Sequence, residues 1–382
     1  MSYEPFGIYV HWPFCAAKCP YCDFNSHVRS QIDDLGWVSG ILRELQFVAE
    51  LQGVSRPAVE TIFFGGGTPS LMRGQSVAKV LDTIAKLWPM APDVEITLES
   101  NPASADAERF RDYRNAGVNR LSLGVQALSD ADLRALGRLH NVAEAKAALR
   151  LAMGCFDRVS LDLIYARPHQ TISQWRSELV EALAFGTDHL SLYQLTIEPA
   201  TPFATLARTG ALTIPDDDTA AALYEVTQEL TDAAGIPAYE ISNHARSGAQ
   251  CRHNQLYWRY GDYAGVGPGA HGRFTLSGRR MALSSERLPE RWRAKIDVQG
   301  HAFVEHFEVT RQDAAREHLL MNLRLTEGIE LTRYESRWKT SLDRQRMAAL
   351  EEEGLLQVRN GHVAATQSGR LVLNSLIAAL AG

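Results

Sequence analysis

The sequence has few cysteines, no long apolar run and no strong excess of charge of either sign. Only five of its 382 residues are cysteine, and 39 basic against 45 acidic side chains give a net charge of −6. Such a composition excludes a disordered or collagen-like chain, and the mildly acidic balance argues against bulk binding of nucleic acid, which needs a basic surface. The length allows one large domain of about 250 residues together with a smaller one.

No segment of the sequence is predicted to cross a membrane or to direct secretion. The most apolar run, Leu371–Ala381, is shorter than the ~18 residues that a spanning helix needs and is interrupted by Asn374. The segment Met1–Phe14 lacks the basic start and the apolar core of a signal peptide. We therefore predict a cytoplasmic protein without a transmembrane segment, in which the thiols are free or metal-bound.

Short apolar strands alternate with helical stretches through most of the sequence. The strands are predicted at residues 7–11, 61–64, 95–99, 120–125, 158–163, 189–195 and 238–241. The helices are predicted at residues 35–51, 75–87, 105–116, 130–136, 142–153, 173–184 and 219–234. This alternation predicts an α/β fold with a parallel sheet, and the number of units favours a partial (β/α) barrel over residues 1–245.

Polar or glycine-rich residues follow several of the predicted strands. They are residues 15–22, 65–68 and 99–102 together with Gln126 and Asp162. Because the carboxyl ends of parallel strands meet at one face of a barrel, we expect these separate loops to form one site.

The pattern changes after residue 245. Residues 246–300 are predicted to carry a histidine motif and a charged connecting stretch at 279–300, and residues 301–382 are predicted to form a smaller domain. In that domain, helices at 310–324, 331–338 and 341–353 precede short strands at 355–359 and 362–365 around an Asn360-Gly361 turn, and a final helix follows. This order is typical of a winged helix, which usually binds nucleic acid. Its 10 basic and 11 acidic residues favour packing or partner contact instead.

Three cysteines, Cys15, Cys19 and Cys22, form a C-x3-C-x2-C motif directly after the first predicted strand. Three thiolates on a short loop suit three corners of a 4Fe–4S cluster and leave the fourth iron open. A zinc site is the alternative, in which His11 or His27 would complete the four ligands.

The cysteine motif, with Tyr21 before its third cysteine and Gly65–Pro69 after the second strand, resembles the radical S-adenosylmethionine (SAM) superfamily. The resemblance implies a partial barrel in which the open iron binds the amino and carboxylate groups of SAM. One electron from the cluster would then cleave the carbon–sulfur bond of SAM to give a 5′-deoxyadenosyl radical. The protein orients the cofactor and excludes water.

Four segments further resemble the oxygen-independent coproporphyrinogen III oxidase family, and this resemblance covers nearly the whole chain. They are residues 9–15, 65–69, 121–126 and 162–165. The implied SAM-binding residues are Tyr9, Tyr21, Gly66, Gly67, Thr68, Glu99, Gln126, Arg138 and Asp162. The two tyrosines would pack near SAM, and the glycine backbone would receive its amino-acid end. The polar side chains would bind its ribose, carboxylate or amino group.

One position departs from the oxidases. They carry a fourth cysteine two residues after the third, whereas this sequence has Phe24 there. The departure argues against oxidative decarboxylation of coproporphyrinogen, leaves the cluster cysteines intact and leaves open whether the chain is an enzyme. Phe24-Asn25-Ser26-His27 is instead similar to the sister branch, the HemW haem chaperones.

A second motif, His-Asn-x-x-Tyr-Trp within residues 251–258, resembles the haem-binding signature of that branch. His253 would offer an imidazole nitrogen to the haem iron, and Tyr257 and Trp258 would offer flat apolar surface. From the residues alone, a hydrogen-bonded histidine beside a packed aromatic pair is the simpler interpretation, and the resemblance reverses that preference. Cys251 is considered as a second ligand, and Cys155 is expected to be a buried apolar side chain.

The resemblance implies a haem chaperone that carries a 4Fe–4S cluster and SAM, binds haem and transfers it to an acceptor protein. The alternatives are an oxidase that converts coproporphyrinogen III to protoporphyrinogen IX, and another radical SAM enzyme of porphyrin metabolism. A regulatory DNA-binding role has the least support. The expected partners are haem, the acceptor and an electron donor, with a homodimer considered through exposed aromatic side chains near residues 257–263.

Overall fold

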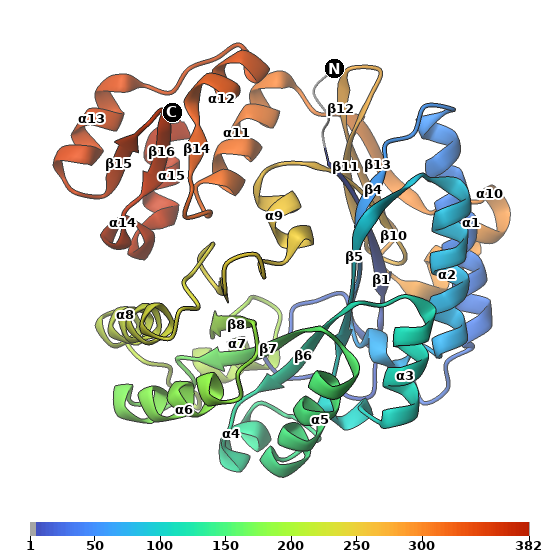
Figure 1. Ribbon diagram of the computed structural model, residues 1–382, viewed down its shortest axis with the longest axis horizontal. Coiled ribbons are helices and arrows are strands. Elements are labelled where there is room, and N and C mark those ends of the chain that lie inside the picture. Colours follow the sequence, from blue (N-terminus) through green and yellow to red (C-terminus); the bar gives the residue numbers. More distant parts are fainter. Residues whose placement is uncertain (1–4, 382) are drawn as a thin grey trace.

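A single curved sheet organises most of the chain in the computed structural model, which describes residues 5–381 (Figure 1). Residues 1–4 and 382 lie outside the described part. They are the first residues of the segment 1–14 and the last residue of the predicted domain 301–382. The strands follow the order β13-β12-β11-β10-β1-β4-β5-β6-β7-β8-β9. The chain thus starts in the middle of the sheet and extends it in both directions.

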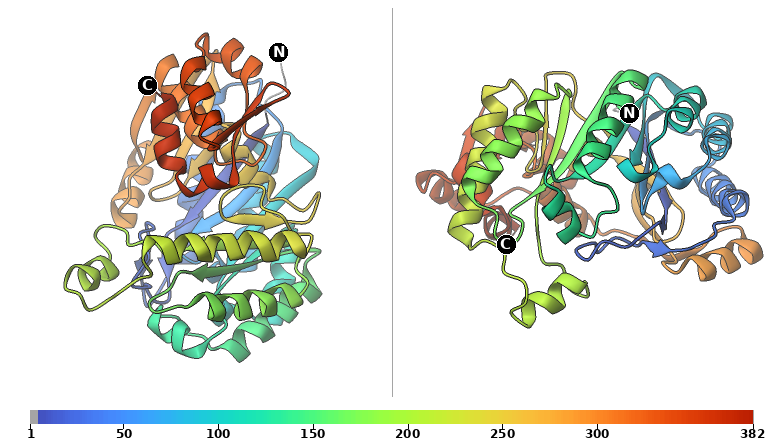
Figure 2. Two further views of the ribbon diagram at one scale, coloured as in Figure 1. Left: turned by 90° about the vertical axis from the view of Figure 1, so that its left-hand side faces the viewer. Right: turned by 90° about the horizontal axis from the view of Figure 1, so that it is seen from below.

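The central strands run parallel and form the predicted partial barrel. They are β1 (Phe6–Trp12), β4 (Val59–Gly66), β5 (Met90–Ser100), β6 (Arg120–Gln126), β7 (Arg158–Tyr165) and β8 (His189–Gln194). The helices that follow them are α1 (Asp34–Gln52), α2 (Gly74–Leu87), α3 (Ala107–Ala116), α4 (Asp130–Ala135), α5 (Val142–Cys155), α6 (Ile172–Ala184), α7 (Pro202–Arg208) and α8 (Asp217–Ala233). Helices α1, α2, α3, α5 and α6 cover the outer side of the sheet (Figures 1 and 2).

Local sequence explains why these helices begin where they do. Asn141 and Glu144 form a reciprocal capping box at the start of α5, and Thr171 and Gln174 form another at the start of α6. Apolar residues of the strands are buried beneath the helices, and this packing determines which face of the sheet lies against the helices. These residues include Ile8, Val10, Ile62, Phe64, Leu121, Leu123, Leu161 and Leu163.

The barrel is open, and both edges differ from the prediction. On one side, β9 (Asn243–Ala245) pairs antiparallel with β8, while the predicted strand at 238–241 contributes only an isolated bridge at Ala238. On the other side, β10 (Asp262–Val266) is parallel to β1. It is followed by the antiparallel strands β11 (His271–Leu276), β12 (Arg279–Ser285) and β13 (Phe303–Glu308). The expectation that residues 279–300 are a connecting stretch was therefore wrong, because they form β12 and α10 (Pro289–Gln299), and the boundary expected at residue 300 falls between α10 and β13.

A buried carboxyl group on α1 joins this edge to the rest of the barrel. Glu44 accepts hydrogen bonds from the backbone N–H groups of Gly267 at 2.7 Å and Ala302 at 3.0 Å, and from Trp292 Nε1 at 3.1 Å. Burial raises the pKa of Glu44 to about 7. Satisfied buried polar groups of this kind specify one packing arrangement.

The C-terminal segment forms a separate small core. Its elements are α11 (Arg311–Asn322), β14 (Ile329–Glu330), α12 (Leu331–Trp338), α13 (Arg344–Glu352), β15 (Leu356–Arg359), β16 (His362–Ala365), α14 (Gln367–Leu371) and α15 (Leu373–Ala381). The β15–β16 hairpin turns at Asn360 and Gly361, both with positive φ, as predicted. Tyr260 and Ala282 from the main sheet region join this core, so the two parts share apolar packing.

Within residues 5–381, we find no helix with the length and the apolar character that crossing a membrane requires.

Candidate functional site

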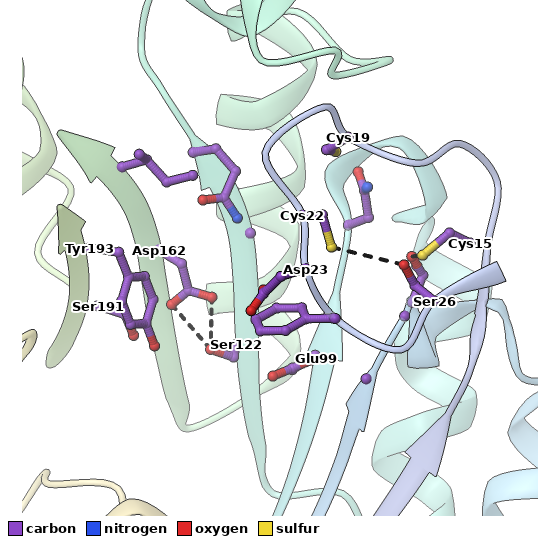
Figure 3. A pocket seen from close by; sticks show the side chains of 18 of the residues that line it. Cys15, Cys19, Cys22, Asp23, Ser26, Glu99, Ser122, Asp162, Ser191 and Tyr193 are labelled. Carbon is purple, nitrogen blue, oxygen red and sulfur yellow. Dashed lines mark hydrogen bonds between the residues drawn. The ribbon is translucent and has the colours of Figure 1, made fainter. Parts of the chain in front are cut away.

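A cavity of about 530 Å³ extends from the cysteine loop into the barrel. Every site residue predicted from the sequence lines it: Tyr9, Cys15, Cys19, Tyr21, Cys22, Gly66, Gly67, Thr68, Glu99, Gln126, Arg138, Asp162 and His253. Figure 3 shows the cysteine side chains on one side of this cavity, opposite Glu99, Ser122 and Asp162. The structure therefore brings together residues that are up to 244 positions apart in the sequence, between Tyr9 and His253.

The cysteine loop is held between two short parallel strands, β2 (Phe14–Cys15) and β3 (His27–Val28). Each thiol has a polar neighbour. The Thr68 hydroxyl donates to Cys15 Sγ at 3.4 Å, Arg138 Nη1 donates to Cys19 Sγ at 3.5 Å, and Cys22 Sγ lies 3.9 Å from Ser26 Oγ. Burial raises the pKa of Cys15 and of Cys22, whereas the hydroxyl bonds act in the opposite direction and favour the thiolate.

Asn25 fixes the far end of the same loop. Its side-chain amide donates to the carbonyl oxygens of Pro268 at 2.8 Å and Arg287 at 2.9 Å, both beyond β10 in the sequence. The loop that carries the cysteines is therefore anchored to the edge of the sheet that β10–β13 build.

The histidines considered as zinc ligands have other partners. His11 Nδ1 bonds the Tyr9 hydroxyl at 3.1 Å and His11 Nε2 bonds the Asn25 carbonyl at 2.9 Å, while His27 Nε2 lies 3.3 Å from Asn25 Oδ1. Among residues 5–381, no three His, Cys, Asp or Glu side chains gather closely enough to hold a single metal ion. Three thiols that face one cavity without a fourth protein ligand fit a 4Fe–4S cluster with one open iron.

The glycine run after β4 packs directly against the cysteine loop. Gly67 N–H donates to the carbonyl of Trp12 at 2.7 Å, and Thr68 N–H donates to the carbonyl of Phe14 at 2.8 Å. A Cβ on Gly67 would lie 2.7 Å from the Phe14 oxygen, and Gly66 has φ of +114°. Only glycine allows this close approach of two backbones, which leaves the cavity side of the run open to a ligand.

Two carboxyl groups, Glu99 and Asp162, line the cavity from the strands on either side of β6. Asp162 accepts hydrogen bonds from Ser122 Oγ at 2.9 Å and from Ser160 Oγ at 2.9 Å. Burial, reinforced by the charge of Asp162, raises the pKa of Glu99 to about 8. At neutral pH, Glu99 is therefore mostly a hydrogen-bond donor and acceptor rather than an anion.

Gln126 and Arg138 form the wall beyond the carboxyl groups. Gln126 adopts φ of +74°, a conformation that non-glycine residues rarely adopt and that is often found at functional sites. Arg138 Nη2 donates to the carbonyl of Gly124 at 2.8 Å, which aims the guanidinium at Cys19. A Cβ on Gly124 would lie 2.8 Å from Gln126 Nε2, so the glycine makes room for this side chain.

The histidine of the second motif lies on α9 (Arg252–Trp258) and is only 1 % exposed. Its Nδ1 bonds Thr61 Oγ1 at 2.8 Å, its Nε2 bonds the Tyr257 hydroxyl at 2.8 Å, and its ring stacks on Phe63 at 5.2 Å. Burial, together with the charge of Arg120, lowers the pKa of His253 to about 3, so the imidazole is neutral.

Of the other aromatic and sulfur groups of the motif, Tyr257 lines this cavity, whereas Trp258 and Cys251 do not. Trp258 lies under the guanidinium of Arg324 at 4.7 Å. Cys251 is fully buried and donates to Glu95 Oε1 at 3.5 Å, so the structure gives no support to a role as second haem ligand. Tyr257 packs on Tyr263 with ring centroids 4.4 Å apart, and both side chains are partly exposed.

Sequence reasoning missed Arg120, which lines the cavity with Ser122 on the same strand. A single arginine at the start of an apolar run looks like a solvent-exposed strand end, and no motif marked it. Sequence reasoning also missed a second cavity of about 430 Å³, which shares Tyr9, Phe24, Gly66, Glu99 and Tyr257 with the first. Phe24, at the position of the missing cysteine, is 64 % exposed and forms part of both walls.

Comparison with known proteins places these observations in a family. The profile described as the radical SAM superfamily matches residues 9–180, and the HemN C-terminal domain profile matches residues 309–372. The sequence is 40 % identical to heme chaperone HemW of Escherichia coli over 98 % of this chain and 97 % of that protein. It is 37 % identical to the mitochondrial radical S-adenosyl methionine domain-containing protein 1 of Bos taurus over 98 % and 87 %, respectively.

A solved structure shows the same fold over nearly the whole length. Coproporphyrinogen III oxidase (HemN) from Escherichia coli superposes with a TM-score of 0.83, covering 99 % of this chain and 90 % of that chain, at 22 % sequence identity. At that identity, the similarity concerns the fold, including the C-terminal domain.

Proposed function

The chain belongs to the radical SAM superfamily and, within it, to the family of the HemW haem chaperones, and we propose that it binds haem and transfers it to an acceptor protein. The observation that carries this proposal is the 40 % identity to a heme chaperone over 97 % of that protein's length. Phe24 supports it, because an exposed aromatic ring stands where the oxidase family has a cysteine.

We propose that Cys15, Cys19 and Cys22 hold a 4Fe–4S cluster, which supplies an open iron for SAM and an electron when reduced. The hydroxyl and guanidinium donors beside the thiols would stabilise the thiolate ligands. Thr68 and Arg138 each reach a cysteine sulfur and line the cavity, so they couple the cluster loop to the SAM-binding wall.

The remaining proposed SAM-binding residues are those that line the cavity beside the loop: Tyr9, Tyr21, Gly66, Gly67, Glu99, Gln126 and Asp162. Asp162 offers a carboxylate to ammonium or hydroxyl donors, whereas Glu99, mostly protonated, offers both a donor and an acceptor. The glycine backbone can approach a ligand closely because it carries no side chain on the cavity side.

His253 is the proposed haem ligand. Its Nε2 becomes available to iron when the Tyr257 hydroxyl turns away, and Tyr9 and Phe63 present flat rings beside it. We propose the cytoplasm as the location, and an acceptor protein, an electron donor and a second copy of the chain as partners.

Anaerobic reconstitution followed by iron and haem quantification tests this function. We expect about four irons per chain and close to one haem. Substitution of the three loop cysteines by serine should remove the iron, whereas Cys155→Ser, outside the cavity, should retain it. His253→Ala should weaken haem binding. A cluster-loaded wild-type protein that does not retain haem would overturn the proposal.

The same preparation distinguishes a chaperone from an oxidase. Incubation with coproporphyrinogen III, SAM and a reductant should yield no sustained formation of protoporphyrinogen IX. Sustained turnover would instead support the oxidase function.

A further inference from the structure

Arg120, the first residue of β6, is a buried cation whose guanidinium has no directly bonded partner among the described residues. The side chain is only 2 % exposed and lines the main cavity. Within residues 5–381, its guanidinium makes no hydrogen bond and no ion pair, and its Nε and Nη1 atoms are buried and unsatisfied. Since arginine stays charged in proteins, this is a positive charge inside the barrel that Glu95 and Asp162 stabilise only through space, with no direct hydrogen bond or ion pair to the guanidinium.

The neighbouring arginine, Arg158, differs from Arg120 because its guanidinium has hydrogen-bond and ion-pair partners. Arg158 is paired with Arg120 in the β6–β7 register, yet it donates to Glu95 Oε2 at 3.0 Å, to Asp188 at 3.4 Å and to the carbonyl of Ala249 at 2.5 Å. Arg158 does not line the cavity, whereas Arg120 does. The unsatisfied guanidinium is therefore the one that a bound molecule can reach.

The nearby carboxyl groups are already engaged elsewhere. Glu95 accepts from Arg158, from the backbone N–H of His253 at 3.2 Å and from Cys251. Asp162 accepts from two serine hydroxyls, and Glu99 is mostly uncharged at neutral pH. Among the described residues, the cavity thus offers a cation that no carboxylate contacts directly, although Glu95 and Asp162 act on it through space.

Strand geometry separates Arg120 from the proposed cofactor end of the cavity. Alternation along β6 puts Arg120, Ser122, Gly124 and Gln126 on the cavity face, and all four line it. Six residues at ~3.3 Å each place Gln126 about 20 Å beyond Arg120 along the strand. Gln126 and Arg138, at the cysteine loop, therefore lie at the other end of the cavity from Arg120, whereas Glu99 and Asp162 lie between the two ends, close enough for charge interaction with Arg120.

We propose that Arg120 binds a carboxylate of the molecule that occupies the inner end of the cavity, and that for a haem cargo this carboxylate is a propionate. The inference rests on the proposed haem binding. A planar guanidinium pairs with a carboxylate through two parallel hydrogen bonds, which fixes the orientation of the ligand as well as its presence. His253 lines the same cavity and lies close enough for the charge of Arg120 to lower its pKa, so iron and propionate contacts would come from one ligand.

The test compares haem with its dimethyl ester, which keeps the macrocycle and the iron but has no free carboxylate. The wild-type protein, reconstituted with its cluster, should bind haem at least about tenfold more tightly than the ester in a spectroscopic titration. In Arg120→Gln, haem affinity should fall to that of the ester. Equal binding of both ligands by the wild type, which needs no variant, would overturn the inference while leaving the proposed function intact.

Arg158→Gln is the matched control. It removes a partly exposed arginine that has partners, so it should lower stability to urea while keeping the preference for haem over the ester. Arg120→Gln should show the opposite, with unchanged or increased stability of the ligand-free protein and a lost preference. If Arg120→Gln instead lost SAM binding and kept the preference for haem over the ester, Arg120 would be assigned to the cofactor and the inference would be overturned. Absence of haem binding by the wild type would overturn the proposed function as well.

Discussion

Burial, more than residue type, sets the charge of the side chains around the cavity. Glu99 and Asp162 are both carboxyl groups on nearby strands of the sheet. Asp162 accepts hydrogen bonds from serine hydroxyls, whereas burial and the charge of Asp162 raise the pKa of Glu99. His253 is likewise kept neutral by burial and by Arg120. The cavity also contains Arg120, whose buried Nε and Nη1 atoms have no hydrogen-bond partner in the described part of the chain.

The raised pKa of Glu99 predicts a pH-dependent stability of the ligand-free protein. Folding keeps Glu99 protonated up to about pH 8, whereas the unfolded chain releases the proton near 4.5, so the folded state binds more protons between these values. Stability should therefore fall as pH rises through this window, by at most about 1.4 kcal/mol per pH unit. Glu99→Gln should become more stable than the wild type as the pH approaches 8, measured by urea unfolding. A constant difference between the two proteins across this range would contradict the assignment.

The site residues that the sequence revealed are those that belong to motifs. The cysteines, the glycine run and the strand-end polar residues are recognisable because their chemistry requires a fixed spacing in the chain. Arg120 carries no such signal, because its importance comes from the absence of a partner in three dimensions. The hydrogen bonds of His253 were equally out of reach, since Thr61 lies 192 residues away.

Among the elements, the turn after β4 and the cysteine loop act as one unit because their backbones touch. Gly67→Ala should push a methyl group into the Phe14 carbonyl, which a Cβ would approach to 2.7 Å. We expect a loss of about 1–3 kcal/mol in the free energy of unfolding and a lower iron content after reconstitution.

A second glycine provides the control for that substitution. A Cβ on Gly154, within α5, would meet no atom within 4 Å, so Gly154→Ala should be neutral or slightly stabilising and should retain iron. Full iron retention in Gly67→Ala, measured alongside this control, would show that the loop tolerates displacement.

The boundaries of helices and strands could be predicted where the apolar periodicity was strong. The predictions failed where contacts between distant parts of the chain determine the boundary. The hairpin at Asn360-Gly361 was predicted because its turn residues are specific. The run at 238–241 has strand-like residues, but the Glu240 carboxylate accepts from Ser242 N–H and from Asn243, which bends the chain, and the pairing moves to 243–245. Strands β11–β13 were missed because the edge strand β13 is almost entirely exposed and because β12 begins with two arginines, of which Arg280 is buried in an ion pair with Asp262 that the sequence does not reveal.

On the scale of the whole molecule, Tyr260 connects the barrel to the C-terminal core. Its ring lies 4.3 Å from the Arg280 guanidinium and stacks on His318 at 5.5 Å, and its hydroxyl donates to Glu317 at 2.6 Å. Tyr260→Ala should therefore cost about 3–5 kcal/mol and make residues 309–381 more sensitive to limited proteolysis.

The conservative variant separates packing from hydrogen bonding at this position. Tyr260→Phe keeps the ring and loses only the bond to Glu317, so its cost should be about 1–3 kcal/mol, with the protease resistance of the C-terminal core preserved. Equal sensitivity of both variants would assign the connection to the hydroxyl rather than to the ring.

The position of β10 beside β1 also determines when the protein can receive its cofactor during synthesis. The cysteines lie in the first 22 residues, but the loop that carries them is anchored by Asn25 to carbonyl groups of Pro268 and Arg287. The first strand likewise lacks one of its two neighbours until residues 262–266 have left the ribosome. Pairings this distant in sequence form late and slowly. The cysteine loop therefore stays incomplete on the nascent chain until about three quarters of the protein has been made, and we expect stable insertion of iron and sulfur to follow synthesis rather than accompany it.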